Sequence, residues 1–480
     1  MNGVVLIRVE RVAGRGGHPR HLHPALDLKI IEAGLRASGV PVALIDGWRQ
    51  AGGPADWTAA ALASQPRIAV IKAETWCLPD AIDCARQLKS AGVQTIAIGQ
   101  QVAHVMRAPL AGWAEAFDMA LAGEAEEELL DALPRLLRRE DGVQQAYVRR
   151  FDAGHRFAVR DQDGLPRPVF SVAEMESFAF PFPLAGRPLR RWAYVLSARG
   201  CPHRCRHCST VVRKSDGDRL RGRSPRLVVD EIAAHLAAGA EAIAFEDDTL
   251  LVDRRHFLAI CDELVRRGLR VPWMANARPD ELDAERVAAA ATAGAVLLKL
   301  GIETVTPRLI EAMGKARHGD AWQGQTEAGM ARLKHHGIST VGLFLLGLPT
   351  QTVGEVTDTL RWAQQLAPDY VQVQIFRAYP DIDWWTDLPP QVRDVEAAYH
   401  YGPVLATAAA IPPQDLARMQ REFYRGYYLR PRFAWSHARK CWRHYCAAEG
   451  IAAALRHLGY LMQQGFQMPA TRRAGLSLVD

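Results

Sequence analysis

Apolar strand-like runs alternate with helix-period segments in two separate blocks of this sequence, one between residues 4 and 137 and one between residues 192 and 376. Strands that alternate with helices predict an α/β protein with parallel sheets, because each helix returns the chain to the edge where the next strand begins. The first block has short units and predicts a doubly wound, Rossmann-like sheet. The second block has six longer units and predicts a partial (β/α)6 barrel that is open on one side. Its expected strands are 192–198, 241–246, 271–275, 296–301, 339–346 and 370–375.

These blocks divide the 480 residues into four parts. We expect a Rossmann-like domain at residues 1–137, a linker with a possible hairpin at 138–190, the barrel at 191–380 and a helical C-terminal region at 381–480. The linker is inferred from a composition rich in Arg, Asp, Gly and Pro. In both sheets, ligands are expected at the carboxyl ends of the strands.

The composition argues against several classes of protein. The 59 Lys and Arg residues exceed the 53 Asp and Glu residues by only six, so the charge does not call for a nucleic-acid partner. No apolar run reaches the length of a membrane span, and the short apolar run near the start has no basic region before it. Eight cysteines in a chain of this length do not form the pattern of a secreted disulfide framework. We therefore expect a cytoplasmic protein without a membrane span.

Three cysteines, Cys201, Cys205 and Cys208, follow the first expected strand of the barrel at the spacing C-x3-C-x2-C. Three thiolates on one short loop can hold three corners of a [4Fe–4S] cluster and leave the fourth iron open to a substrate or cofactor. Two alternatives remain. Zinc binds Cys and His, so His203 or His207 could complete a zinc site, and cysteines can also pack as small apolar residues.

The cysteine loop resembles that of the radical S-adenosylmethionine (SAM) enzymes in spacing and in its position after a strand and Gly200. The resemblance implies that Cys201, Cys205 and Cys208 hold a [4Fe–4S] cluster whose open iron binds the amino and carboxylate groups of SAM. In that superfamily an electron from the cluster cleaves SAM to a 5′-deoxyadenosyl radical, which abstracts hydrogen from a substrate. An electron donor such as flavodoxin or ferredoxin is then expected.

Polar residues and turns follow the later strands of the barrel, and the same resemblance implies a role in binding SAM for some of them. The alternatives are ordinary: solvent exposure or helix capping for the acidic stretch after the second strand, a surface ion pair for the arginine, and a structural turn for the glycine. The strand ending in Gly-Ile-Glu is similar to the Gly-Ile-Glu-Ser segment of the family. The residues expected to bind SAM are Glu246, Asp247, Arg278, Glu303 and Gly347.

The first block is similar to the cobalamin-binding domain that precedes the barrel in one large subgroup of this family. Its counterparts of the typical glycine turn and Gly-Glu-x-Glu segment imply cobalamin contacts at Gly99, Gly123 and Glu124. The chain departs from the subgroup at residues 99–102, which read Gly-Gln-Gln-Val in place of Gly-Gly-Pro-His. It also has no D-x-H-x-x-G motif, so no histidine is expected below the cobalt. The alternative is a Rossmann-like domain that binds nothing.

The segment around Phe423 and Pro431 resembles relatives of the anaerobic magnesium-protoporphyrin cyclase and of hopanoid-modifying enzymes. The whole resemblance implies a cobalamin-dependent radical SAM enzyme, most simply a methyltransferase that acts on a poorly activated carbon of a small molecule. The cofactors would carry the difficult chemistry and the protein would orient and shield the reactants. The alternatives are cyclisation, ring rearrangement or oxygen or sulfur insertion with the same cofactors, and a zinc-stabilised corrinoid-binding protein that catalyses nothing.

Overall fold

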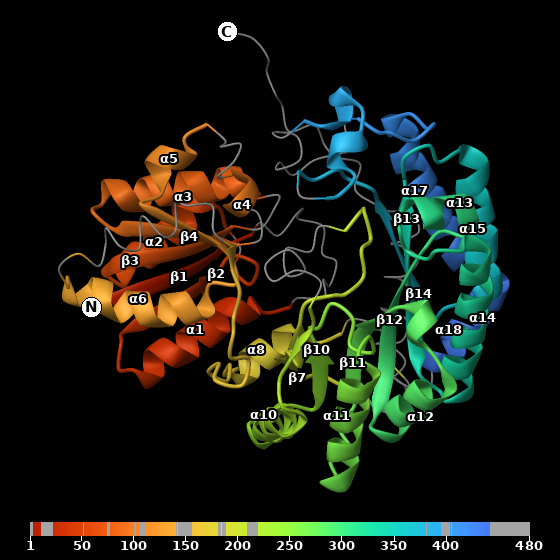
Figure 1. Ribbon diagram of the computed structural model, residues 1–480, viewed down its shortest axis with the longest axis horizontal. Coiled ribbons are helices and arrows are strands. Elements are labelled where there is room, and N and C mark those ends of the chain that lie inside the picture. Colours follow the sequence, from red (N-terminus) through yellow and green to blue (C-terminus); the bar gives the residue numbers. More distant parts are fainter. Residues whose placement is uncertain are drawn as a thin grey trace.

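The computed structural model contains two parallel sheets that lie side by side in two lobes (Figure 1). In Figure 1 the lobe coloured red to orange is built from the first block of the sequence, and the lobe coloured green to blue from the second and from the C-terminal region. The structure describes residues 3–10, 23–50, 52–73, 77–99, 102–105, 111–140, 142, 156–180, 184, 189–208, 219–380, 382–394, 404 and 406–441.

The first sheet has six parallel strands in the order β2-β1-β3-β4-β5-β6. Helices α1 and α6 pack on one face of the sheet, and helices α2, α3 and α5 pack on the other. The doubly wound prediction is therefore confirmed. The strands are β1 (Gly3–Val9), β2 (Val42–Asp46), β3 (Pro66–Ala73), β4 (Gln94–Gly99), β5 (Met119–Gly123) and β6 (Arg156–Phe157); the helices are α1 (Leu26–Ala37), α2 (Pro54–Ala63), α3 (Leu78–Ser90), α4 (Val102–Val105), α5 (Trp113–Ala116) and α6 (Glu126–Arg138).

The second sheet also has six parallel strands, in the order β14-β13-β12-β11-β10-β7. Neighbours in the sheet follow one another along the chain apart from the short pair β8–β9, and β7 and β14 lie at opposite edges, as an open (β/α)6 barrel requires. The strands are β7 (Trp192–Val195), β10 (Ala242–Phe245), β11 (Trp273–Ala277), β12 (Ala295–Glu303), β13 (Ser339–Leu346) and β14 (Tyr370–Ile375); the helices are α10 (Pro225–Ala237), α11 (Arg254–Arg266), α12 (Ala284–Thr292), α13 (Pro307–Ala312), α14 (Gly319–His335) and α15 (Val353–Leu366).

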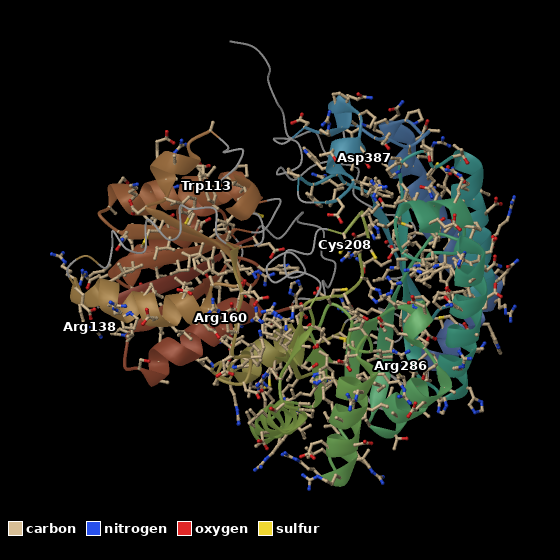
Figure 2. The ribbon with its side chains drawn as sticks, viewed as in Figure 1. Trp113, Arg138, Arg160, Cys208, Arg286 and Asp387 are labelled. Carbon is tan, nitrogen blue, oxygen red and sulfur yellow. The ribbon has the colours of Figure 1, made fainter. Side chains whose placement is uncertain are left out.

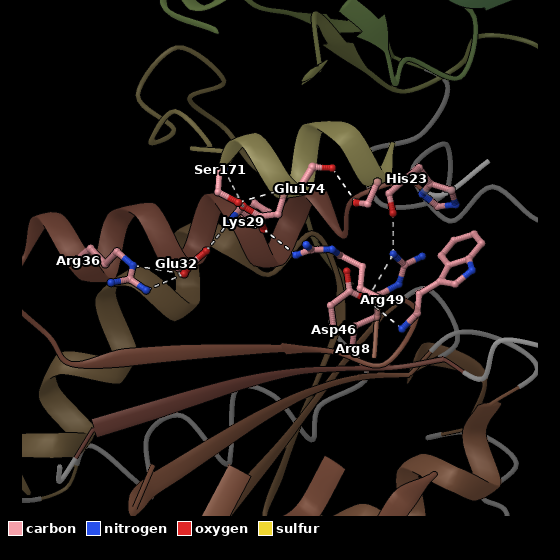
Figure 3. A network of polar contacts seen from close by, with 11 residues as sticks. Arg8, His23, Lys29, Glu32, Arg36, Asp46, Arg49, Ser171 and Glu174 are labelled. Carbon is pink, nitrogen blue, oxygen red and sulfur yellow. Dashed lines mark hydrogen bonds and ion pairs between the residues drawn. The ribbon is translucent and has the colours of Figure 1, made fainter. Parts of the chain in front are cut away.

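The segment between the lobes is tied closely to both. Its strand β6 lies parallel to β5 and extends the first sheet. Its helix α8 (Val172–Ser177) starts at Ser171, whose hydroxyl accepts a hydrogen bond from the backbone of Glu174. The carboxylate of Glu174 in turn pairs with Lys29 of α1 at 3.1 Å and with Arg49 at 3.4 Å (Figure 3). The linker therefore joins the lobes as a packed connector.

The C-terminal helices α17 (Pro413–Tyr428) and α18 (Pro431–Cys441) cover the outer edge of the barrel. The backbone N–H groups of Val371 and Val373 in β14 donate to the hydroxyls of Tyr428 and Tyr424, both at 2.9 Å. These bonds satisfy donors that an edge strand would otherwise leave open. The tyrosines of this segment therefore act as structural residues. No helix in the described part of the chain is both long enough and apolar enough to cross a membrane.

Candidate active site

The cysteine loop leaves the barrel at the carboxyl end of β7, and Cys208 lies between the two lobes in Figure 2. The loop begins after β8 (Ala198–Arg199) and returns through β9 (Arg221–Gly222), and these two short strands pair antiparallel at its base. Gly200 has a φ of +97°, and a Cβ at this position would collide with the carbonyl oxygen of Arg219. The narrow base of the loop therefore requires glycine there.

Residues far along the chain support the loop from outside. The backbone N–H of Arg206 donates to the carbonyl of Met313, at the end of α13, at 2.8 Å, and the carbonyl of Arg206 accepts from Trp384 at 3.1 Å. The ring of His203 contacts Glu281 at 3.1 Å. Burial lowers the pKa of His207 to about 4, so this imidazole is neutral near pH 7. The ring of His203 therefore has a carboxylate partner, whereas the buried Nδ1 of His207 has no hydrogen-bond partner in the described part of the chain.

The guanidinium of Arg278, after β11, reaches the cysteine loop directly. Its Nη1 donates to the Sγ atom of Cys205 at 3.4 Å, and its Nη2 donates to the carbonyl of Lys315 at 2.6 Å. The structure thus brings Arg278 to the cluster loop and also pairs it with the carboxylate of the exposed Asp280, at 3.0 and 2.7 Å.

The three cysteines fit a [4Fe–4S] cluster by donor type and position. Cys205 is buried against Arg278, whereas Cys201 and Cys208 are partly exposed. Burial raises the pKa of the Cys201 thiol to about 12, so that a thiolate there needs the positive charge of bound iron. Among the described residues, no three Cys, His, Asp or Glu side chains are arranged to hold a single metal ion.

Glu303 at the end of β12 adopts a backbone conformation that is uncommon for a residue other than glycine, with a φ of +66°. Its carboxylate turns back to the buried ammonium of Lys315 at 2.7 Å. Burial by itself would raise the pKa of Glu303, but Lys315 and His207 hold it below its usual value. Gly301 makes the turn possible, because a Cβ there would lie 2.8 Å from the Lys315 Nζ.

Asp247 and Glu246, in the acidic stretch after β10, have different surroundings. Asp247 is 2% exposed, and its two oxygens accept from the backbone N–H and the hydroxyl of Ser197 at 3.0 and 2.6 Å. It therefore holds the ends of β7 and β10 together, whereas the sequence predicted a contact with SAM. Glu246 is 38% exposed and keeps its carboxylate open to the space between the lobes. Of the two candidates, Glu246 is the one available to a ligand.

Gly347 lies in the turn after β13, where its φ is +77° and its N–H donates to the Oε1 of Gln351 at 2.7 Å. A Cβ at Gly347 would meet a methyl carbon of Leu416 in α17 at 2.9 Å. The glycine therefore lets the C-terminal helix approach the barrel. Its predicted contact with adenine stays a prediction.

Glu124 and Glu126, at the start of α6, pair with the two arginines at the base of the cysteine loop. The carboxylate of Glu124 accepts from both Nη atoms of Arg221 at 2.5 and 2.7 Å, and Glu126 accepts from Arg199 at 2.5 Å. All four side chains are nearly buried. Arg199 and Arg221 are paired residues of β8 and β9, at the base of the loop. The two glutamates of the first lobe therefore bind the loop at its base. We call these four residues the clamp.

The clamp changes the interpretation of the Gly-Glu-x-Glu segment. Glu124 was predicted to contact cobalamin, but its carboxylate is committed to Arg221 and to the backbone N–H of Val159 at 2.7 Å. Gly99 and Gly123 lie at the carboxyl ends of β4 and β5, where a doubly wound sheet binds its ligands. Their predicted contacts with cobalamin stay predictions.

The carboxyl ends of the two sheets face each other. His23, from the first lobe, approaches the carboxylate of Glu246 in the second at 3.8 Å. Burial raises the pKa of Glu246, and three positive groups oppose this rise: Lys299 of the barrel and Lys72 and Arg8 of the first sheet. Arg8 also donates to the carbonyl of His23 at 2.7 Å (Figure 3). A ligand between the lobes would therefore touch both sheets at their ligand-binding edges.

Five residues of this site were not predicted from the sequence: Arg199, Arg221, Ser197, Lys315 and Lys299. The first four bind side chains elsewhere in the chain, and nothing in the sequence next to them indicates those partners. Lys299 carries a charge inside a strand and did leave a local signal, because a lysine in the apolar run Leu297–Leu300 marks a face that is not packed in a core.

Residues 195–363 match the family model of the radical SAM superfamily. This stretch contains the three cysteines and the barrel strands from the end of β7 to β13. The chain therefore contains a radical SAM domain. It is an enzyme, and this domain implies a [4Fe–4S] cluster and SAM as its cofactors.

Other similarities extend beyond the radical SAM domain. An uncharacterized methyltransferase of Pyrococcus horikoshii is 27% identical over 329 residues, which are 67% of this chain and 69% of that protein. The anaerobic magnesium-protoporphyrin IX monomethyl ester cyclase of Rubrivivax gelatinosus is 26% identical over 55% of this chain. The chain matches about half the length of that cyclase, 46%.

Solved structures share the two-lobed fold. The radical SAM methyltransferase TsrM of Kitasatospora setae, solved with cobalamin and a [4Fe–4S] cluster, matches 82% of this chain and 78% of its own with a TM-score of 0.61 at 17% identity. The cobalamin-dependent radical SAM enzyme OxsB, solved with aqua-cobalamin, matches 80% of this chain and 55% of its own with a TM-score of 0.57 at 16% identity. At these identities the likeness concerns the fold.

Reversing one charge of the clamp is expected to loosen the cysteine loop. Arg221→Glu would leave Glu124 buried beside a like charge, and breaking a buried pair costs about 3–5 kcal/mol. We expect a lower melting temperature and less iron retained per chain after anaerobic reconstitution and gel filtration. The double variant Arg221→Glu/Glu124→Arg should recover part of both losses.

The matched control is the exposed pair of Asp358 and Arg361 on α15, 59% and 69% exposed. Its reversal should leave iron content and melting temperature within error, because exposed pairs contribute little. Equal iron retention in wild type and Arg221→Glu would show that the clamp does not position the loop.

Asp247 is expected to make the protein less stable as the pH rises. Burial raises its pKa to about 6 in the folded protein, from an ordinary value of 3.8, so the folded state binds the proton more tightly. The stabilisation from this group is complete below pH 4 and is lost as the pH rises to about 6. Asp247→Asn should therefore flatten the melting temperature between pH 4 and 6.5, relative to wild type and to the exposed control Asp358→Asn. Parallel pH profiles would contradict the assignment.

Proposed function

We propose that this enzyme is a cobalamin-dependent radical SAM methyltransferase that transfers a methyl group, by way of methylcobalamin, to a poorly activated carbon of a small molecule. One observation carries the proposal: the cysteine loop lies between the carboxyl ends of a partial barrel and of a Rossmann-like sheet, which face each other. TsrM, a methyltransferase solved with cobalamin and a cluster, supports it through its shared two-lobed fold.

Residues of the chain would divide the work among them. Cys201, Cys205 and Cys208 would hold the cluster, and Arg278 would stabilise the Cys205 thiolate through its 3.4 Å contact. Glu246 would receive the amino group of SAM with its open carboxylate. When bound, the cluster and SAM supply the radical, and cobalamin carries the methyl group.

The surrounding fold would exclude water from the reactants. Phe178 and Phe180 fill the barrel below the site, where their rings lie 5.5 Å from Tyr194 and 6.5 Å from Tyr370. The clamp would fix the cluster loop against the first lobe, whose strand ends at Gly99 and Gly123 are the proposed place of the cobalamin. Electrons would come from a flavodoxin or ferredoxin in the cytoplasm.

A second candidate function uses the same cofactors for ring formation without methyl transfer. The observation that favours it is the 26% identity to the magnesium-protoporphyrin cyclase, over 55% of this chain. The two candidates differ in product mass when the methyl group of SAM carries deuterium, since methyl transfer delivers that group to the product and cyclisation does not.

Cofactor content tests the proposal directly. Anaerobically reconstituted protein is expected to hold about four iron and four sulfide per chain and to bind cobalamin, and to cleave SAM to 5′-deoxyadenosine when reduced. Cys205→Ala should lose the iron and the cleavage. Cys261→Ala is the control, because this thiol is buried in α11 away from the loop.

Each contrary outcome removes a different part of the proposal. Iron and SAM cleavage without bound cobalamin would keep a radical SAM enzyme but remove methylcobalamin from its reaction. A colourless protein with stoichiometric zinc would contradict the cluster itself.

A further inference from the structure

Lys299, in the middle of β12, points into the interior of the barrel. In parallel strands, residues that lie side by side point to the same face. Lys299 lies beside Asn276 of β11 and Val341 of β13, and two residues further along β13 lies Leu343, beside Gln372 of β14. The opposite face of these strands packs against the helices through residues such as Leu298 and Leu300. The face that carries Lys299 is therefore the lining of the barrel.

This lining is open in its upper half. Along β12, β13 and β14 the helix-facing residues are buried, whereas lining residues are partly or fully exposed: Lys299, Gly301, Leu343, Leu345, Gln372 and Gln374. On β14 the alternation is sharp, because both glutamines are exposed and Val371 and Val373 are buried. Lower in the barrel, Met274 and Leu297 on the same face are buried. The upper part of the barrel lining is therefore open above an apolar floor, and Lys299, Gln372 and Gln374 supply its polar groups; we call this open part the chamber.

The ammonium of Lys299 has no hydrogen bond or ion pair with any residue in the described part of the chain. Glu246 interacts with it through space, but the nearest ionisable contact of that carboxylate is His23 of the other lobe. Burial lowers the pKa of Lys299, and Glu246 opposes that shift. A partly buried charge without a bound partner is costly, so such a residue is retained for a ligand more readily than for the fold.

Lys299 lies in the middle of β12, and Glu303 lies four residues further along the same strand, where it binds Lys315. With a rise of about 3.3 Å per residue, Lys299 lies roughly 13 Å deeper in the barrel than Glu303. The amides of Gln372 and Gln374 line the same chamber from the edge strand β14, where Gln372 pairs with Leu343 and Gln374 with Leu345. A molecule held by Lys299 and both glutamines would extend from the middle of β12 toward the carboxyl end of β14.

We propose that Lys299 binds an anionic group, a carboxylate or a phosphate, of the enzyme's substrate, and that Gln372 and Gln374 hydrogen-bond its polar remainder. The inference rests on the proposed function, since it takes the barrel chamber as the substrate site. The charge-assisted bond of an ammonium to an anion is stronger than a neutral hydrogen bond, so the lysine would select anionic over neutral molecules of one shape.

The test compares acids with their uncharged amides on the reconstituted holoenzyme. The probes are acetate and acetamide, benzoate and benzamide, and indole-3-acetate and indole-3-acetamide, with phenyl phosphate as the phosphate arm, and binding is measured by isothermal titration calorimetry. We expect wild type to prefer at least one acid over its amide, or phenyl phosphate over benzamide, by at least about tenfold, and Lys299→Met to reduce that preference to less than about threefold. Lys334→Met is the control, because that lysine is exposed on α14, and it should keep the wild-type preference.

The outcomes separate this inference from the proposed function. No preference in wild type, or an equal preference in Lys299→Met, overturns the inference even when the protein holds iron and cleaves SAM. Weaker SAM binding by Lys299→Met would place the lysine on SAM's own carboxylate and would also overturn it. A protein without cluster or SAM cleavage fails the proposed function, whatever its preference for acids.

Discussion

Two buried ion pairs between the lobes, Arg199 with Glu126 and Arg221 with Glu124, hold the structure around the cysteine loop. Buried pairs add little to stability overall, because the attraction roughly repays the cost of removing both charges from water. The two side chains of each pair must nevertheless stay in contact, since either charge without its partner is strongly destabilising. The pairs therefore act mainly to fix where the loop lies. The three cysteines can hold one cluster between the lobes only when the loop lies in that position.

The rest of the fold makes a closed space beside the loop. The barrel is a sheet with two free edges, and the hydroxyls of Tyr424 and Tyr428 satisfy the backbone of one edge strand. Phe178 closes the floor by contact with Tyr194. At the open end of the barrel lies the first sheet, whose Arg8 and Lys72 are positive groups near Glu246. A reactive intermediate formed here would be surrounded by the barrel, its floor and the first sheet.

Much of the fold followed from local pattern. The bounds expected for β13 and β14 agree with the structure, because apolar and β-branched residues mark these strands clearly. The clamp was beyond prediction because its partners are 73 and 97 residues apart. Glu124 and Asp247 each bind a distant residue of the chain, and their predicted contacts with cobalamin and with SAM stay predictions.

The long separation of the clamp residues has a consequence for how the enzyme is assembled. Contacts between distant residues form late in folding, after the loops that join them have been closed. The base of the cysteine loop therefore takes its final shape only after both lobes have folded and met. Iron delivered earlier would encounter three thiols on an unconstrained segment. A barrel made without its first lobe would lack Glu124 and Glu126, two of the four residues that fix this base.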